Sequence, residues 1–243
     1  MAPGASDRSR KAAAHKVAGA ARHVLLAALT LALGGILGFS LTAAQESWFS
    51  VLIPGAYAAG RGPASTRADL WQHELFAPFP GVVTALAVVA NFLFTHNTMV
   101  GILAFGLGFA AGVPTLLLLA YQGVVLGAFV ALHYDRGLAV EFIGWVSVHG
   151  VTELTATVLC GAAGLLIADK ILFPGRYSRI ESLAQHGRAA GQIAVGAVGL
   201  FFVAAILEGV FRQLVQSTPL RLSIGAATAL LWAAYFLLRP ESV

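Results

Sequence analysis

Apolar residues fill most of this chain in long runs, which short polar or glycine- and proline-rich segments separate. Crossing the hydrocarbon core of a bilayer takes about 20 mainly apolar residues, with a range of roughly 17–25. The pattern predicts an all-α, polytopic membrane bundle in a single transmembrane domain over 24–240. Its spans, about six of them, are expected near 24–44, 98–113, 115–132, 138–168, 189–211 and 222–238.

The longest apolar run, over 99–132, contains Pro114. As one helix it would be about 50 Å long, which exceeds the ~30 Å hydrocarbon core. It therefore either breaks near Pro114 or kinks there, and the glycines before and after the proline favour a hairpin of two short spans. The run over 138–168 is also long, so a tilt, or a break at His149 and Gly150, is expected.

Residues 45–94 differ from the rest of the chain because they are rich in proline, glycine and aromatic residues. Ser65 or Thr66 is a suitable cap for a short helix over 67–76. The apolar segment 82–94 is short for a full crossing and is expected at the interface or as a re-entrant segment. Trp and Tyr suit the headgroup level, so we predict an outer interfacial cap over 45–94.

Composition agrees with a membrane protein and excludes an ordinary soluble domain. Hydrophobic residues make up 58% of the chain and charged residues only 11%, against about 25% charged in soluble domains. The mean hydropathy is +0.81. The net charge is +4, but the basic residues lie between apolar runs, a distribution that topology explains. We therefore expect the lipid bilayer as a partner and no nucleic acid.

The basic residues also predict an orientation, because cytoplasmic segments carry an excess of Lys and Arg. With six spans, residues 1–23 form a basic cytoplasmic tail and both termini are cytoplasmic, in a bacterial inner membrane. The cytoplasmic parts then hold ten basic residues and the outer parts five. The ten are Arg8, Arg10, Lys11, Lys16, Arg22, Lys170, Arg176, Arg179, Arg188 and Arg239; the five are Arg61, Arg67, Arg136, Arg212 and Arg221.

The candidate chemistry centres on His149 and Glu153, which lie four residues apart inside an apolar run. Residues at this spacing are neighbours on one helix face. Ionisable side chains at membrane depth are costly and usually face a bundle interior or a water-filled cavity, paired with a partner. We expect the two residues to pair, and we predict a buried polar cluster of His149, Glu153, Glu208, His96, Asn97 and Gln122.

This cluster has three interpretations. The favoured one is a buried hydrogen-bonded pair that fixes helix packing, and the second is a proton or ion pathway. In the third, His149 and Glu153 bind a metal; a zinc site needs at least three protein ligands, so His96 and Glu208 would have to complete it. The chain has no H-E-x-x-H motif, and we expect no bound cofactor.

Other polar residues in apolar runs have simpler interpretations. Glu208 and Arg212 are spaced for a helical ion pair in the favourable order, and Glu208 alternatively turns inward to His149. His96 or Asn97 is expected to satisfy free N–H groups at the start of a helix. Gln122 is expected to hydrogen-bond across helices.

Six short motifs occur in an order that resembles the stage II sporulation protein M family, and the resemblance extends from about residue 24 to 240. They are Phe94-Thr-His-Asn97, Gly112-Val-Pro114, Tyr121-Gln-Gly-Val-Val-Leu-Gly-Ala128, His149-Gly-Val-Thr-Glu-Leu154, Phe173-Pro-Gly-Arg176 and Ile206-Leu-Glu-Gly-Val-Phe-Arg212. Family members usually carry Asn where this chain has His96 and Gln122.

The resemblance implies a non-enzymatic role. In endospore formers the family's namesake assembles with two peptidoglycan-degrading partners in the membrane. We therefore expect a scaffold or assembly factor for cell-envelope or peptidoglycan-remodelling proteins. The alternatives are a small transporter or channel that uses the His/Glu cluster, and an intramembrane metal-dependent hydrolase. The glycine-rich helix faces also permit a homo-oligomer.

Overall fold

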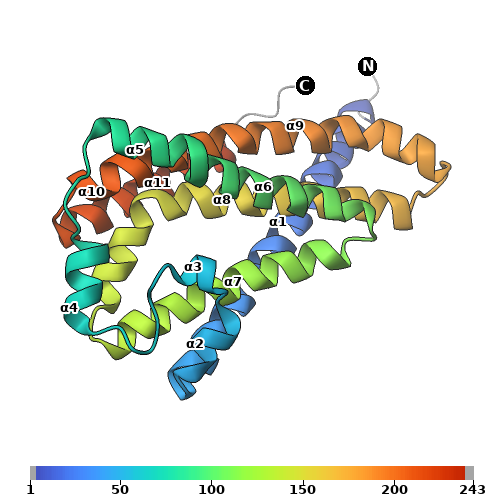
Figure 1. Cartoon of the computed structure of the whole chain (residues 1–243). Helices are drawn as coiled ribbons and strands as arrows, with labels where there is room; N and C mark the ends of the chain where they lie inside the picture. The colour runs from blue at the N-terminus through green and yellow to red at the C-terminus, as the bar shows by residue number, and fades with distance from the viewer. Residues whose placement is uncertain (1–3, 239–243) are drawn as a thin grey trace.

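The computed structural model describes the backbone of residues 4–238 and the side chains of residues 21–89 and 92–236. Within this part the chain forms helices and no strands (Figure 1). The long helices are α1 (Gly4–Ala44), α7 (Val113–Asp135), α8 (Ala139–Leu172), α9 (Arg179–Ile206) and α11 (Thr218–Leu238). Most of the predicted tail over 1–23 lies outside the described side chains; its backbone from Gly4 belongs to α1.

Two further runs are interrupted by π-helical turns. The first joins α5 (Val82–Val88), the π turn η2 (Val89–Leu93), α6 (Phe94–Gly106) and the 3₁₀ turn η3 (Leu107–Phe109). The second continues α9 through the π turn η4 (Leu207–Phe211) into α10 (Arg212–Leu214). π turns insert one residue into a helix and are frequent at functional sites.

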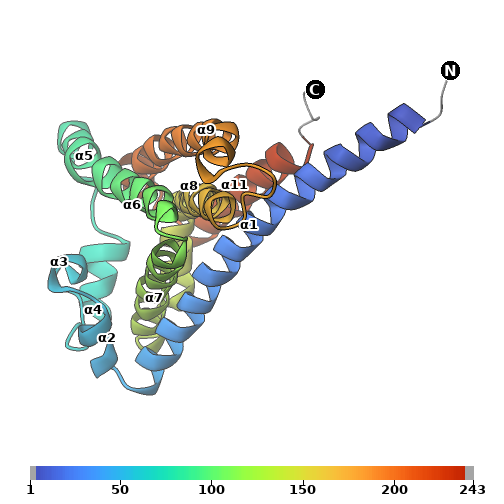
Figure 2. The same ribbon diagram turned by 90° about the vertical axis from the view of Figure 1, so that its right-hand side faces the viewer.

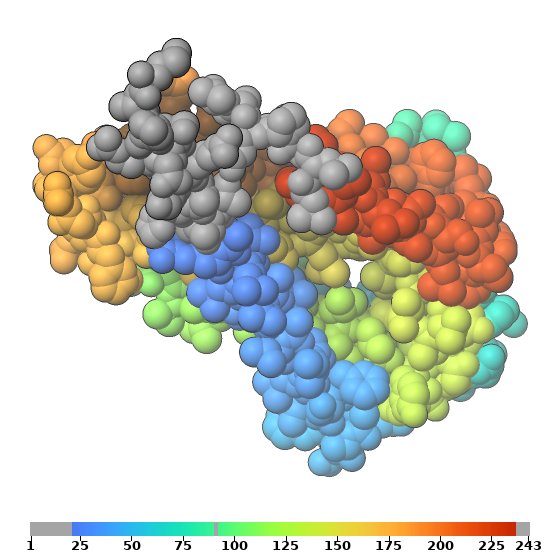
Figure 3. All heavy atoms as spheres, turned by 180° about the vertical axis from the view of Figure 1, so that it is seen from behind, coloured from blue at the N-terminus to red at the C-terminus, as the bar shows by residue number. Residues whose placement is uncertain are grey.

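The predicted helical membrane bundle is confirmed. Four stretches of the described chain are long and apolar enough to cross a membrane: Ala21–Ala44, Val113–Asp135, Ala139–Leu172 and Arg179–Leu214. The number of six spans remains a prediction. Figures 1 and 2 show α6 and α9 lying along α8, while α1 crosses the bundle obliquely. Figure 3 shows α1 and α11 on the face of the molecule that is hidden in Figure 1.

Glycines bring α1 and α7 into close contact. A Cβ atom at Gly34 would collide with the carbonyl oxygen of Ala120, and one at Gly127 would collide with the carbonyl oxygen of Gly35. Gly34 and Gly38 on α1, and Gly123 and Gly127 on α7, are each spaced four residues apart, as in close-packed transmembrane pairs. These glycines therefore allow the two backbones to touch.

The run around Pro114 forms a hairpin. Between η3 and α7 the chain turns through Ala111 and Gly112, which both have positive φ angles of 60° and 77°. Pro114 lies in the first turn of α7. The N–H groups of a first turn have no acceptor within the helix, so a proline there costs no helical hydrogen bond. The buried Thr115 hydroxyl donates a 2.9 Å hydrogen bond to the Ala104 carbonyl and ties α7 to α6.

The segment after α1 forms the cap as short helices: α2 (Ser47–Leu52), α3 (Gly55–Ala58), α4 (Arg67–Leu70) and the π turn η1 (Trp71–Leu75). Thr66 caps α4, and its hydroxyl accepts a hydrogen bond from the Asp69 amide. Phe49, Leu70 and Leu75 of this segment are buried in one apolar cluster with Phe129 and Phe142. The cap is therefore part of the folded core.

Residues 82–94 belong to the same helical run as α6, and their position at the interface or as a re-entrant segment stays a prediction. Because the helix starts at Val82, after Gly81 with a φ of 92°, His96 and Asn97 do not cap a helix start. Both residues lie inside the continuous helical run and line a cavity. The run over 138–168 is also unbroken at His149 and Gly150; α8 bends along its length instead (Figure 1).

Candidate functional site

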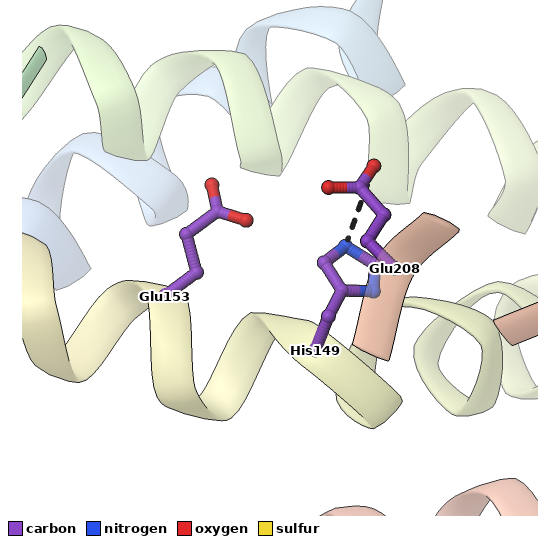
Figure 4. A group of neighbouring side chains, drawn as sticks. All are labelled: His149, Glu153 and Glu208. Carbon is purple, nitrogen blue, oxygen red and sulfur yellow. Dashed lines mark ion pairs between the residues drawn. The ribbon is translucent and has the colours of Figure 1, made fainter. Parts of the chain in front are cut away.

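Three ionisable side chains converge inside the bundle. His149 and Glu153 point from the same side of α8 toward Glu208 on η4 (Figure 4). His149 Nε2 lies 3.9 Å from Glu208 Oε1. One potential ligand atom from each of the three residues lies within 4.8 Å of the other two. The arrangement thus combines one imidazole with two carboxylates.

The local sequence explains how these side chains meet. The spacing of four residues places His149 and Glu153 on one face of α8. Glu208 lies in a π turn, which changes the direction of a side chain relative to a regular helix. Its neighbour Gly209 allows η4 to approach η2, because a Cβ atom there would collide with Val89 Cγ2.

The trio lies beside a cavity of about 300 Å³ between α6, α7, α8, η4 and the cap. This cavity is lined by all members of the predicted polar cluster: His149, Glu153, Glu208, His96, Asn97 and Gln122. Tyr57 and Arg61 of the cap also line it. Residues from five sequence segments therefore line one cavity.

The pairing within the cluster differs from the expected one. No hydrogen bond joins His149 to Glu153 in the described part of the chain; the carboxylate that His149 Nε2 faces is that of Glu208, at 3.9 Å. Nδ1 of His149 is buried and has no hydrogen-bond partner among the described residues. The structure thus leaves His149 without the hydrogen bonds expected of a buried imidazole.

Glu208 has a second partner. Arg212 Nη1 donates a 2.7 Å hydrogen bond to Glu208 Oε1, and the Arg212 guanidinium lies 4.0 Å from the centre of the Trp145 ring. Trp145 in turn meets His149 edge-on, with ring centres 6.2 Å apart. Glu208 therefore forms the helical ion pair and faces inward to His149 at the same time, so the two alternatives are compatible.

His96 and Gln122 occupy other walls of the cavity. The His96 ring stacks on Phe92, with centres 5.6 Å apart, and meets Tyr57 edge-on at 5.2 Å. These aromatic contacts fix the ring beside the cavity without a carboxylate partner. Gln122 lines the wall formed by α7.

A second buried ionic group was not predicted from the sequence. Arg61 Nη1 donates a 2.5 Å hydrogen bond to Glu74 Oε1, and His133 Nε2 lies 3.3 Å from Glu74 Oε2. Burial alone would raise the pKa of Glu74, but His133 and Arg61 outweigh it and lower that pKa below its ordinary value. His133 belongs to α7, and Arg61 and Glu74 lie 13 residues apart in the cap, so no helical spacing reveals the group.

Arg221 was also missed, because the sequence suggested a loop over 212–221. The chain is helical again from Thr218, and the Arg221 side chain is fully buried. Its Nε donates a 2.6 Å hydrogen bond to the Val215 carbonyl, and its Nη2 donates to the Arg212 carbonyl at 3.1 Å. Arg221 thus satisfies carbonyl groups where α10 ends, next to the trio.

Comparison with known proteins gives one match. A family model described as stage II sporulation protein M matches residues 27–211. This range includes the cap, the cavity and all three residues of the trio. No curated protein and no solved structure matches the chain.

Proposed function

The chain belongs to the stage II sporulation protein M family, and on this basis we propose that it is an integral membrane scaffold for cell-envelope or peptidoglycan-remodelling proteins. Its apolar helices make it a membrane protein. The resemblance implies envelope partners, and a partner needs a surface outside the apolar helices that keeps its shape.

The cap supplies such a surface, and its rigid attachment is the observation that carries the proposal. Arg136 binds Glu46 through two hydrogen bonds of 2.7 and 3.0 Å. Arg67 donates to the carbonyl oxygens of Arg136 and Gly137 at 2.8 and 2.7 Å. The cap is thus joined to the turn between α7 and α8 by one arginine of the cap and one arginine of the turn.

The fixed cap also presents apolar side chains outward. Trp48, Val51 and Trp71 are exposed, and Val51 most of all at 72%. Aromatic residues are enriched at protein–protein contacts. In the proposed topology this surface lies on the outer side of the inner membrane, where peptidoglycan is remodelled, and both termini are cytoplasmic. The first turns of α1 and the last turn of α11 lie on one side of the bundle (Figures 1 and 2).

Site-specific photo-crosslinking in bacterial cells tests the scaffold. A photoreactive residue replaces Val51 on the cap, or Val195 on α9 as a matched control with 74% exposure. Ile180, exposed at 81% on the first turn of α9, is a second control, because the proposed topology places it on the cytoplasmic side of the membrane. We expect Val51 alone to crosslink to a protein that mass spectrometry identifies as an envelope or peptidoglycan-remodelling factor. Equal crosslinking at all three positions, or none at Val51, would contradict the proposal.

A small transporter or channel is the second candidate, and the polar cavity favours it. The space of about 300 Å³ next to His149 and Glu153 is large enough for several water molecules or a small solute. This function requires a water-accessible path from the cavity to one face of the membrane. Labelling of single cysteines placed in the cavity wall with membrane-impermeant thiol reagents tests that requirement.

A further inference from the structure

The trio of His149, Glu153 and Glu208 has the composition of a metal site. In the part of the chain whose side chains are described, it is the one group of three or more His, Cys, Asp or Glu residues with ligand atoms this close together. The residues come from two helices that already pack together, α8 and the run through η4. The position is therefore set by the fold and not by a flexible loop.

His149 supplies an independent reason to expect a ligand. The residue is only 6% exposed, and the ring nitrogen that points toward the Glu208 carboxylate is Nε2 (Figure 4). Its Nε2 is 3.9 Å from Glu208 Oε1, beyond the usual hydrogen-bond range of 2.7–3.2 Å. Buried imidazoles normally have partners, and this one faces two carboxylates beside a cavity.

The donor set limits the identity of the ligand. Calcium and magnesium prefer oxygen ligands alone, whereas a mixture of imidazole and carboxylates suits zinc and neighbouring transition metals. Metal–ligand bonds of about 2.0–2.2 Å require the ligand atoms to move closer than their present 4.8 Å limit. In the proposed site, the flexible side chains of Glu153 and Glu208 supply this movement.

We propose that His149, Glu153 and Glu208 together bind one divalent transition-metal ion, Zn²⁺ or Mn²⁺. With a neutral imidazole, the two carboxylates supply the negative charge that attracts the ion, and Arg212 balances one of these charges through Glu208. Arg212 acts as a positioning residue: it holds the Glu208 carboxylate by its 2.7 Å hydrogen bond while its guanidinium rests on Trp145. Such outer contacts orient metal ligands. The remaining coordination positions of the ion face the cavity.

The first test measures metal bound to the full chain. The protein is purified from membranes in detergent with a tag that contains no histidine, and its metal content is determined by mass spectrometry. We expect about one Zn²⁺ or Mn²⁺ per chain, as in a single three-ligand site. After removal of the ion with a chelator, Zn²⁺ and Mn²⁺ titrations should restore the same stoichiometry. A chain that neither retains nor rebinds an ion would overturn the proposal.

Variants locate the ion. Glu153→Gln and Glu208→Gln keep the side-chain volume and should each abolish stoichiometric binding. Arg212→Gln should weaken affinity by about 10- to 100-fold, the usual effect of losing an outer contact. His96→Asn changes another wall of the same cavity, and Glu74→Gln changes the other buried His–Glu pair; both should bind as the unmodified chain does. Equal binding by all variants would place the ion elsewhere.

A spectroscopic measurement covers the case in which a variant does not fold. The unmodified chain loaded with Mn²⁺ should show coupling to ¹⁴N of an imidazole in pulsed electron paramagnetic resonance. His149→Gln should remove this coupling, and circular dichroism reports whether that variant remains helical. Bound Mn²⁺ without nitrogen coupling in the unmodified chain would exclude His149 as a ligand and refute the proposed site.

Discussion

Arg212 binds Glu208 across one helical turn, with Nη1 2.7 Å from Oε1. Both side chains are mostly buried, and the same carboxylate oxygen faces His149. The ion pair therefore connects the π turn of one helix to the polar face of α8.

Removal of one partner of this pair should be costly. In Arg212→Met, Glu208 stays buried without its guanidinium, and we expect a loss of about 3 kcal/mol of unfolding free energy, as for other broken buried pairs. Denaturant unfolding in detergent, followed by circular dichroism, measures it. The double variant Glu208→Gln with Arg212→Met should recover part of the loss, because it leaves no unpaired charge. A double variant as unstable as the sum of the single variants would show that the pair is not coupled.

The contact between α1 and α7 should be sensitive to one methyl group. Gly127→Ala places a Cβ atom against backbone atoms of Gly35, and overpacking of this kind costs about 1–3 kcal/mol. Gly199→Ala on α9 is the control, because nothing lies within 4 Å of its added Cβ; it should stabilise the helix by about 0.5–1 kcal/mol. Thermal unfolding in detergent compares the two. Equal effects would argue against close backbone packing of α1 and α7.

The sequence predicted the fold class well because the relevant signals are local. The length of an apolar run and the proline at 114 depend on neighbours in the chain, and both the membrane bundle and the hairpin follow from them. The prediction that His96 or Asn97 starts a helix was wrong. The helix begins at Val82 and runs through both residues, which line the cavity.

In the candidate site, too, the relation between residues of one helix could be predicted, and the contacts between helices could not. The one-turn spacing of His149 and Glu153 put them on one face, but their relation to Glu208 depends on how η4 packs against α8. The ionic group around Glu74 could not be predicted, because its partners Arg61 and His133 come from separate segments of the chain. Tertiary contacts of this kind leave no periodic signal in one sequence.

Acid should loosen the cap. The pKa of Glu74 is lower in the folded protein than its ordinary value of 4.5, so its contribution to stability is present above about pH 4.5 and is lost as the pH falls through the lower, folded value. Arg61 and His133 face this carboxylate. We expect backbone amides over 45–75 to exchange hydrogen faster at pH 3 than at pH 6, after correction for intrinsic rates. Glu74→Gln should exchange fast at both values; an unchanged pH dependence in this variant would assign the effect to another group.

Water access to the cavity distinguishes the two candidate functions. Cys160 is the only cysteine and is fully buried, so the unmodified chain should not react with a membrane-impermeant maleimide. In Gln122→Cys the thiol faces the cavity; Leu119→Cys, one turn away and fully buried, is the control. A transporter or channel predicts that the thiol at 122 reacts in intact vesicles while the one at 119 does not, because water reaches only the cavity wall. A scaffold whose cavity is closed predicts that neither reacts, and in that case the polar cluster serves the stability of the bundle or its metal ion and not the passage of a solute.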